Sequence, residues 1–269
     1  MSKLRRTERI IALTKVLVDS PGHLFSLNYF CELFGAAKST LSEDVLTIRQ
    51  VMLEFGLGNL ETVSGAAGGV RFRPFQPEQV IGDFLYELAG KLATPDRIIP
   101  GGFLYMTDIL FTPELMVRVG EIFFTKFAHL TPDYVMTVET KGIPLAFMTA
   151  RAFDLPLVIV RQGNKVTEGP SVSISYVTGS AKRIQSMSLP RRAIPAGSRV
   201  LVIDDFMKAG GTARGILDLA QEVGVDIVGT GVLVGTAEPR VKLVRDYLPL
   251  LVLHEVDQER KTIDIRPAL

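Results

Sequence analysis

The chain has 269 residues, 47% of them hydrophobic and 22% charged, so it is long enough for two domains and is not an intrinsically disordered protein. Its formal net charge of +1 excludes a general electrostatic attraction to nucleic acid, and its single cysteine excludes an internal disulfide and a cysteine-rich metal site. The charged start and the lack of an apolar run near the roughly 18 residues of a membrane span lead us to expect a cytoplasmic protein.

Three helices are expected in the first part of the chain. Apolar residues recur at helical spacing from Arg5 to Asp19, and a second helix begins at Ser26. Gly35 makes a sharp turn, and a third helix starts near Lys38. Three helices with a glycine turn before the last are typical of a helix-turn-helix, whose third helix can enter the major groove of DNA.

Residues 60–63 and 70–73 alternate apolar and polar side chains on either side of a glycine-rich stretch, which predicts a β-hairpin. Arg71 and Arg73 are two residues apart, so both guanidinium groups are expected on one face of the hairpin. A helix-turn-helix followed by such a hairpin resembles the winged-helix module. We therefore predict a winged-helix DNA-binding domain over residues 1–74.

The start of the third helix offers short donors and a cation, which suit phosphates and base edges. Ser39 is equally compatible with an ordinary helix cap. Nine basic residues stand against seven acidic ones in residues 1–74, so a few placed groups must read a specific site, and a domain that only dimerises is the competing interpretation. The expected DNA-binding residues are Lys38, Ser39, Thr40, Ser42, Arg49, Arg71 and Arg73.

Residues 75–269 are predicted to form a separate α/β domain. The prolines at 74 and 77 mark the boundary, and residues 78–92 have the apolar stripe of a helix. Predicted strands at residues 134–138, 157–160, 200–203, 227–234 and 250–256 alternate with helical patterns. Such alternation predicts a parallel sheet with helices on both faces.

The predicted strand at residues 200–203 is followed by two carboxylates and a loop of small residues. Asp204 and Asp205 are expected at the edge where α/β sheets bind ligands, and Thr212 can cap the next helix. Backbone amides of the loop, aided by the positive end of the helix, suit a phosphate. The carboxylates would repel that phosphate but suit hydroxyl donors, so the pattern predicts a phosphorylated sugar as ligand.

A second loop, residues 139–144, follows the predicted strand at 134–138. Lys141 lies there between small residues, at the carboxyl end of the strand, and this arrangement suits an anion. The sequence thus predicts two loops that hold one polyanionic ligand.

The order of residues 100–109, the Lys141 loop, residues 157–161 and the Asp204-Asp205 string resembles that of adenine and xanthine phosphoribosyltransferases. The resemblance implies a type I phosphoribosyltransferase fold that binds phosphoribosyl pyrophosphate (PRPP), with Mg²⁺ as its companion. It also implies a mobile loop over residues 162–186. The expected PRPP-binding residues are Asp204, Asp205, Lys208, Ala209, Gly210, Gly211, Thr212, Thr140, Lys141, Gly142 and Tyr105.

The pairing of the two predicted domains resembles the purine operon repressors of Gram-positive bacteria over the full chain. The resemblance implies binding to operator DNA upstream of purine genes and release by PRPP, with no catalytic residue. A repressor of this size is expected to act as a homodimer that matches a two-fold operator. We also expect other phosphorylated nucleotides, guanosine alarmones among them, to compete with PRPP at the same site. We expect no metal site built from the protein alone.

An active purine phosphoribosyltransferase with an accessory winged-helix domain remains the alternative. Several transferases of this fold carry an acid four residues after the first acid of the motif, where this chain has Lys208. A cation there cannot accept a proton from a purine at neutral pH, although adenine enzymes also lack that acid. Glu168 and Tyr176 would be the groups able to assist such a reaction.

Overall fold

The computed structural model describes residues 4–65, 68–163, 169–177 and 184–268. The chain divides into two compact units. One comprises Met1–Val80 together with Arg151–Asp154, and the other comprises Ile81–Ala150 and Leu155–Leu269.

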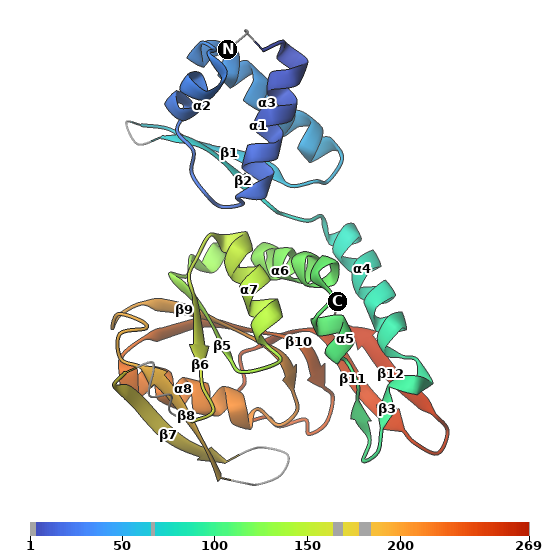
Figure 1. Ribbon diagram of the computed structural model, residues 1–269. Coiled ribbons are helices and arrows are strands. Elements are labelled where there is room, and N and C mark those ends of the chain that lie inside the picture. The colour runs from blue at the N-terminus through green and yellow to red at the C-terminus, as the bar shows by residue number, and fades with distance from the viewer. Residues whose placement is uncertain (1–3, 66–67, 164–168, 178–183, 269) are drawn as a thin grey trace. The chain divides into compact units, whose positions relative to one another are not determined.

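The first unit has the three helices and the hairpin expected of a winged helix (Figure 1). Its elements are α1 (Arg6–Asp19), α2 (Leu27–Phe34), α3 (Lys38–Glu54), β1 (Asn59–Val63) and β2 (Gly69–Arg73). Ser26 caps α2, because its Oγ accepts the amide of Tyr29 at 3.1 Å, and Gly35 ends α2 in the left-handed region with φ 61°. Helix α3 begins after Ala37, which places Ser39 inside its first turn and not at its cap.

The core of the first unit consists of the apolar faces that the helical spacing predicts. Leu13 and Leu17 of α1 pack against Phe30 of α2 and the buried face of α3, and Leu60 and Val70 close the core from the hairpin. The face of α3 that is buried carries Leu41, Val45, Ile48 and Met52. The third helix that the sequence predicts from near Lys38 is therefore confirmed.

The second unit is built on one mixed sheet of six strands. The strands of this unit that bear on the site are β5 (Tyr134–Val138), β6 (Leu157–Val160), β7 (Ser171–Val177), β8 (Ile184–Pro190), β9 (Arg199–Met207), β10 (Asp226–Thr236), β11 (Leu248–Asp257) and β12 (Thr262–Pro267). The order in the sheet is β12-β11-β10-β9-β5-β6, and β7 and β8 pair with each other as a separate hairpin. All neighbouring strands of the sheet run parallel except β12, which is antiparallel to β11 at the edge.

Helices cover both faces of this sheet, as the alternating pattern predicts. The helices of the unit are α4 (Glu78–Leu92), α5 (Thr107–Leu110), α6 (Pro113–Phe127), α7 (Ile143–Phe153) and α8 (Gly211–Val223), with short 3-10 turns at Pro95–Arg97 and Ala128–Leu130. Helix α8 and the β7–β8 hairpin cover one face, whereas α6 and α7 cover the other (Figure 1).

Several elements of the second unit have no counterpart among the elements expected from the sequence. A small hairpin of β3 (Ile98–Ile99) and β4 (Phe103–Leu104) precedes the sheet. The others are α5, α6, the β7–β8 hairpin and β12. They extend the unit around the sheet without changing its parallel core.

The sheet reverses its strand order between β5 and β9. From β5 the chain crosses to β6 on one side, and from β9 it crosses to β10 and β11 on the other. Strand β9 pairs with β5 only as far as Val202, yet it pairs with β10 as far as Met207. The two central strands therefore separate at their carboxyl ends, which is where ligands bind in open α/β sheets.

Candidate functional site

The acidic doublet lies on β9 just beyond the point where β9 leaves β5. The prediction that the strand ends before the carboxylates was wrong, because pairing with β10 continues through Asp204 to Met207. The Asp205 amide donates to Asp204 Oδ1 at 3.0 Å. The two carboxyl groups are thus held side by side at the mouth of the gap.

Burial raises the pKa of both carboxyl groups. Desolvation raises the pKa of Asp204 well above its ordinary value, and the neighbouring charge of Asp205 raises it further. Desolvation also raises the pKa of Asp205, while the cation of Lys141 opposes that rise. A doublet of this kind retains a proton readily until donors, such as sugar hydroxyls, stabilise the ionised form.

The loop after the doublet forms a cradle of backbone amides at the start of α8. Gly210 occupies the cap position with φ 80°, and the helix begins at Gly211, so the prediction that Thr212 caps α8 was wrong. Only a residue that tolerates positive φ fits at position 210. The first amides of a helix have no intrahelical acceptor and carry the positive end of its dipole, so this turn faces the gap as an anion site.

The segment between β10 and β11 supports this cradle from behind. Lys242 Nζ donates to the Lys208 carbonyl at 2.5 Å and to the Pro239 carbonyl at 3.2 Å. The Leu243 amide donates to the Ala209 carbonyl at 3.0 Å. The backbone of Lys208 and Ala209 is therefore fixed, while the Lys208 side chain is exposed.

The Lys141 loop forms the opposite side of the gap, and it includes a cis peptide between Glu139 and Thr140. Lys141 lines the same cavity as the doublet. A Cβ at Gly142 would lie 2.8 Å from Asp204 Oδ1 and would overlap the Thr137 hydroxyl, so only glycine fits there. The two loops that the sequence singles out are brought together.

A cavity of about 570 Å³ lies between the loops. Eight of the predicted ligand residues line it, whereas Thr140 and Gly142 adjoin it through the Lys141 loop. Tyr105 does not line it: its side chain is 44% exposed, and its backbone bonds to Arg97. The eight predicted residues that line the cavity are Lys141, Asp204, Asp205, Lys208, Ala209, Gly210, Gly211 and Thr212.

One wall of the cavity is apolar, and the sequence did not point to it. The β3–β4 hairpin contributes Ile99 and Phe103, and Leu253 of β11 adds to them. A two-stranded hairpin of two-residue strands has no periodicity to recognise, so only the resemblance of residues 100–109 hinted at this wall.

Of the two residues named for assistance in catalysis, Tyr176 lies in β7 and donates its hydroxyl to Gln185 Oε1 at 3.0 Å. Glu168 and parts of the expected mobile loop, residues 164–168 and 178–183, lie outside the described residues. Within the described chain, no group of three or more His, Cys, Asp or Glu side chains is placed to hold a metal ion.

The start of α3 presents part of the expected DNA-binding surface. Lys38 and Ser39 are exposed, whereas Thr40 is half-buried and the Ser42 hydroxyl donates to the Lys38 carbonyl at 2.9 Å. Arg49 is exposed, and its Nε donates to Asn59 Oδ1 at 3.3 Å. Lys38, Ser39 and Arg49 are thus the exposed members of this set on α3.

The two wing arginines share one face of the hairpin, as their spacing predicts. Arg71 and Glu61 form a bidentate pair across the strands, with Nε–Oε2 2.9 Å and Nη2–Oε1 3.1 Å, and Arg73 Nε lies 3.4 Å from the same carboxylate. The hydrogen bond from Arg71 is the main cause that holds the pKa of Glu61 below its usual range. The Glu61 carboxylate therefore neutralises part of the positive charge on this face of the hairpin.

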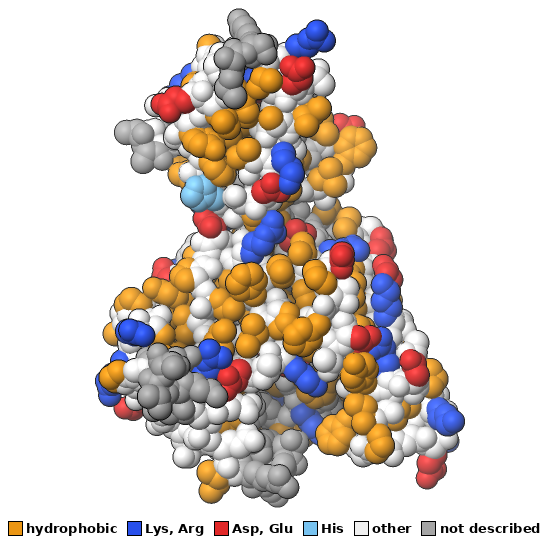
Figure 2. All heavy atoms as spheres, viewed as in Figure 1, with side chains coloured by type: hydrophobic (Ala, Val, Ile, Leu, Met, Phe, Trp, Pro, Cys, Tyr) orange, Lys and Arg blue, Asp and Glu red, His pale blue; other side chains and the backbone are white. Residues whose placement is uncertain are grey.

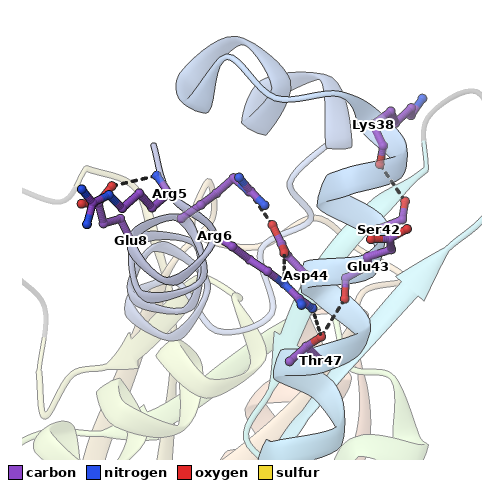
Figure 3. Close-up of polar contacts among 9 residues, drawn as sticks. Arg5, Arg6, Glu8, Lys38, Ser42, Glu43, Asp44 and Thr47 are labelled. Atoms are coloured by element: carbon purple, nitrogen blue, oxygen red, sulfur yellow. Dashed lines mark hydrogen bonds and ion pairs between the residues drawn. The ribbon is translucent and has the colours of Figure 1, made fainter. Parts of the chain in front are cut away.

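A buried ion pair joins α1 to α3. Arg9 Nε donates to Asp44 Oδ2 at 2.5 Å, and both side chains are at most 8% exposed. Arg6 reaches from α1 to the same carboxylate and donates to Thr47 Oγ1 at 3.1 Å (Figure 3). These contacts fix the angle at which α3 is held by the rest of the unit.

No helix among the described residues has the length and apolarity that crossing a bilayer requires.

Comparison with protein families matches both units. A family described as "Bacterial purine repressor, N-terminal" matches residues 5–74, and the "Phosphoribosyl transferase domain" matches residues 106–261. The adenine phosphoribosyltransferase structure from Thermoanaerobacter pseudethanolicus superimposes with a TM-score of 0.53 over 62% of this chain and 98% of that one, at 22% identity, and thus shows the fold of this domain.

Curated relatives match almost the whole chain. The purine biosynthesis transcriptional repressor PurR of Bacillus subtilis (strain 168) is 46% identical over 98% of this chain and 93% of its own length. The purine biosynthesis transcriptional activator PurR of Lactococcus lactis subsp. lactis (strain IL1403) is 36% identical over 98% of this chain and 97% of its own. The xanthine phosphoribosyltransferase of Geobacillus thermodenitrificans (strain NG80-2) is 32% identical but covers only 56% of this chain.

A purine-repressor DNA-binding unit joined to a phosphoribosyltransferase-type domain defines a transcriptional regulator. The chain belongs to the PurR family of purine biosynthesis regulators.

Proposed function

We propose that this regulator represses purine biosynthesis genes by binding operator DNA, and that PRPP bound in the 570 Å³ cavity relieves the binding without being transformed. The observation that carries the proposal is the union, in one cavity, of the Asp204–Asp205 doublet, the amide cradle of α8 and Lys141. Each matches a different part of PRPP: sugar hydroxyls, a phosphate and a pyrophosphate.

In the proposed complex, Asp204 and Asp205 accept the ribose hydroxyls, and the backbone from Ala209 to Thr212 holds the 5′-phosphate. Thr140, Lys141 and Gly142 face the pyrophosphate. Mg²⁺ would arrive with the pyrophosphate oxygens, because the described residues offer no cluster of three ligating side chains for it. Other phosphorylated nucleotides, guanosine alarmones among them, would compete for the same cradle.

The absence of catalysis is proposed from the position of Lys208. A group that handles the protons of a purine must be able to exchange one near neutral pH, and an exposed ammonium does not accept one there. The same cation attracts a polyanion. The alternative of an active purine phosphoribosyltransferase rests on the partial match to xanthine phosphoribosyltransferase and predicts nucleotide and pyrophosphate from PRPP and a purine base.

On the DNA side, we propose that the exposed first turn of α3 contacts the operator through Lys38 and Ser39, aided by Thr40, Ser42 and Arg49. The wing arginines Arg71 and Arg73 would follow a phosphate backbone. Figure 2 supports a specific site over bulk attraction, since basic and acidic side chains are interspersed on the visible face of this unit.

We also propose that the protein acts as a homodimer, because a two-fold operator is matched by a two-fold protein. Figure 2 shows apolar side chains gathered over α6 and α7, and Phe147 of α7 is 56% exposed. Helix α4 is a poorer interface, because Ile81, Phe84 and Leu88 on its apolar stripe are buried within the chain.

The test is an anisotropy titration of a labelled purine-gene promoter fragment at fixed salt, with and without PRPP and Mg²⁺. Saturating PRPP should weaken operator binding about 5- to 150-fold, the range of typical allosteric coupling. Asp204→Ala should bind the operator normally and ignore PRPP. The matched control is Asp218→Ala on α8, a surface acid paired with Arg214 away from the cavity lining, and it should respond as the wild type does.

Operator affinity that is indifferent to PRPP would refute the regulation. Nucleotide formation from PRPP and adenine, guanine, hypoxanthine or xanthine at an ordinary enzymatic rate would refute the non-catalytic site instead.

A further inference from the structure

Thr137 carries a buried hydroxyl that neither the sheet nor the described residues around it satisfy. The residue lies on β5, its exposed fraction is 0%, and its Oγ1 makes no hydrogen bond within the described chain. A buried polar group without a partner is costly, and native proteins keep such groups where they have a use.

The position of Thr137 is the point where β5 and β9 separate. The last residue pair between these strands is Met136 with Val202, one residue before Thr137. Thr137 therefore stands beside the gap that opens on the β9 side, while β5 stays paired with β6 through Val138.

Gly142 shows what this hydroxyl faces. A Cβ there would overlap Thr137 Oγ1 and would lie 2.8 Å from Asp204 Oδ1. Because glycine has only hydrogen at that position, the hydroxyl and the carboxylate oxygen both border the same small space. The Asp205 amide already donates to this oxygen at 3.0 Å, so one further donor would give it two hydrogen bonds from the protein.

We propose that Thr137 is a positioning residue for effector binding: its hydroxyl donates to Asp204 Oδ1 when sugar hydroxyls hold the doublet in its ionised form. The inference rests on the proposed binding of a phosphorylated sugar and deepens it. In the free protein the hydroxyl stays without a partner and destabilises the fold. In the loaded protein a rotation of the Asp204 carboxylate brings donor and acceptor together.

This role predicts opposite effects of one substitution on stability and on affinity. Thr137→Val keeps the shape and removes the hydroxyl, so the unfolding temperature of the free protein should stay equal or rise. The dissociation constant for PRPP with Mg²⁺ should increase about tenfold, the worth of one net hydrogen bond to a charged group. A residue that only fills space would lower stability and leave affinity unchanged.

The experiment is isothermal titration of the full chain with PRPP and Mg²⁺, paired with thermal unfolding without ligand. Thr137→Ser is the conservative rescue: it should bind within about twofold of wild type and unfold at a lower temperature, because it loses only a methyl group. If the valine variant does not fold, Thr137→Ala compared with Thr137→Ser isolates the same hydroxyl.

A dissociation constant of Thr137→Val for PRPP within twofold of the wild-type value would overturn this inference and leave the proposed function standing. Equal loss of affinity in the valine and serine variants would also overturn it, because packing would then be the cause. A wild-type chain that gives no heat with PRPP would remove the proposed function itself, and the inference with it.

Discussion

Gly142 lies so close to Asp204 that a Cβ at position 142 would stand 2.8 Å from the Asp204 Oδ1 atom. The Lys141 loop and the acidic doublet, more than sixty residues apart in the chain, thus meet at one cavity. The contact lies where β5 and β9 part, so the strand reversal of the sheet is what brings the two loops together.

Gly142→Ala should weaken PRPP binding at least tenfold, because the added methyl group must displace either the Asp204 carboxylate or the Lys141 loop. Operator binding in the absence of PRPP should remain as in the wild type. Isothermal titration and promoter anisotropy measure the two effects. Gly90→Ala is the matched control, since Gly90 lies in α4 with nothing within 4 Å of its would-be Cβ, and it should change neither.

The wing offers a prediction of tighter binding. Glu61→Gln removes the carboxylate that holds Arg71 at 2.9 Å, so the Arg71 guanidinium becomes available to phosphates. Binding to non-specific DNA should tighten, and the slope of log K against log salt should steepen by about 0.9 for each additional phosphate that the protein neutralises. Anisotropy titrations over a salt series check this.

Asp218→Asn is the control for the wing prediction. It removes the same charge and frees Arg214 in the same way, but on α8 of the other unit. Non-specific affinity that rises equally in both variants would attribute the effect to net charge and not to the wing.

The sequence predicts the polar residues of the site better than the apolar residues that line the rest of the cavity. Asp204, Gly210 and Lys141 stand in short strings whose residue types suit a ligand, so each could be assigned from local pattern. Thr212 was assigned as a cap because a hydroxyl before a helix is typical of one, yet Gly210 with its positive φ takes that place. Ile99 was not predicted, since a residue in a two-residue strand acquires its role only from tertiary packing.

The buried pair of Arg9 and Asp44 should matter more for stability than any surface pair of the first unit. Removing Arg9 leaves the buried Asp44 carboxylate with the exposed Arg6 as its counter-ion, which costs up to about 3–5 kcal/mol. Arg9→Met should therefore reduce the protection of α1 and α3 amides in hydrogen exchange of the full chain and weaken operator binding. Lys15→Met breaks the exposed pair with Asp19 instead and should cost under about 1 kcal/mol. Similar protection in both variants would contradict this account.

Ionisation of the buried acidic doublet should lower the stability of the free protein at neutral pH. Burial raises the pKa of Asp204 well above its unfolded value near 3.8, so the folded state holds its proton more tightly than the unfolded state does. The contribution of this carboxyl group to folding stability is complete below the pKa of the unfolded state and is lost as pH rises through the pKa of the folded state.

Asp204→Asn, which cannot ionise, should therefore raise the unfolding temperature at pH 7 by roughly 2–4 °C, about 1 kcal/mol for a chain of this size. The gain should vanish near pH 4, and PRPP binding should be lost at every pH. Thermal unfolding of both proteins across this range measures the difference. An Asp204→Asn protein that is less stable than the wild type at pH 7 would show that the carboxylate is already well satisfied before any effector arrives.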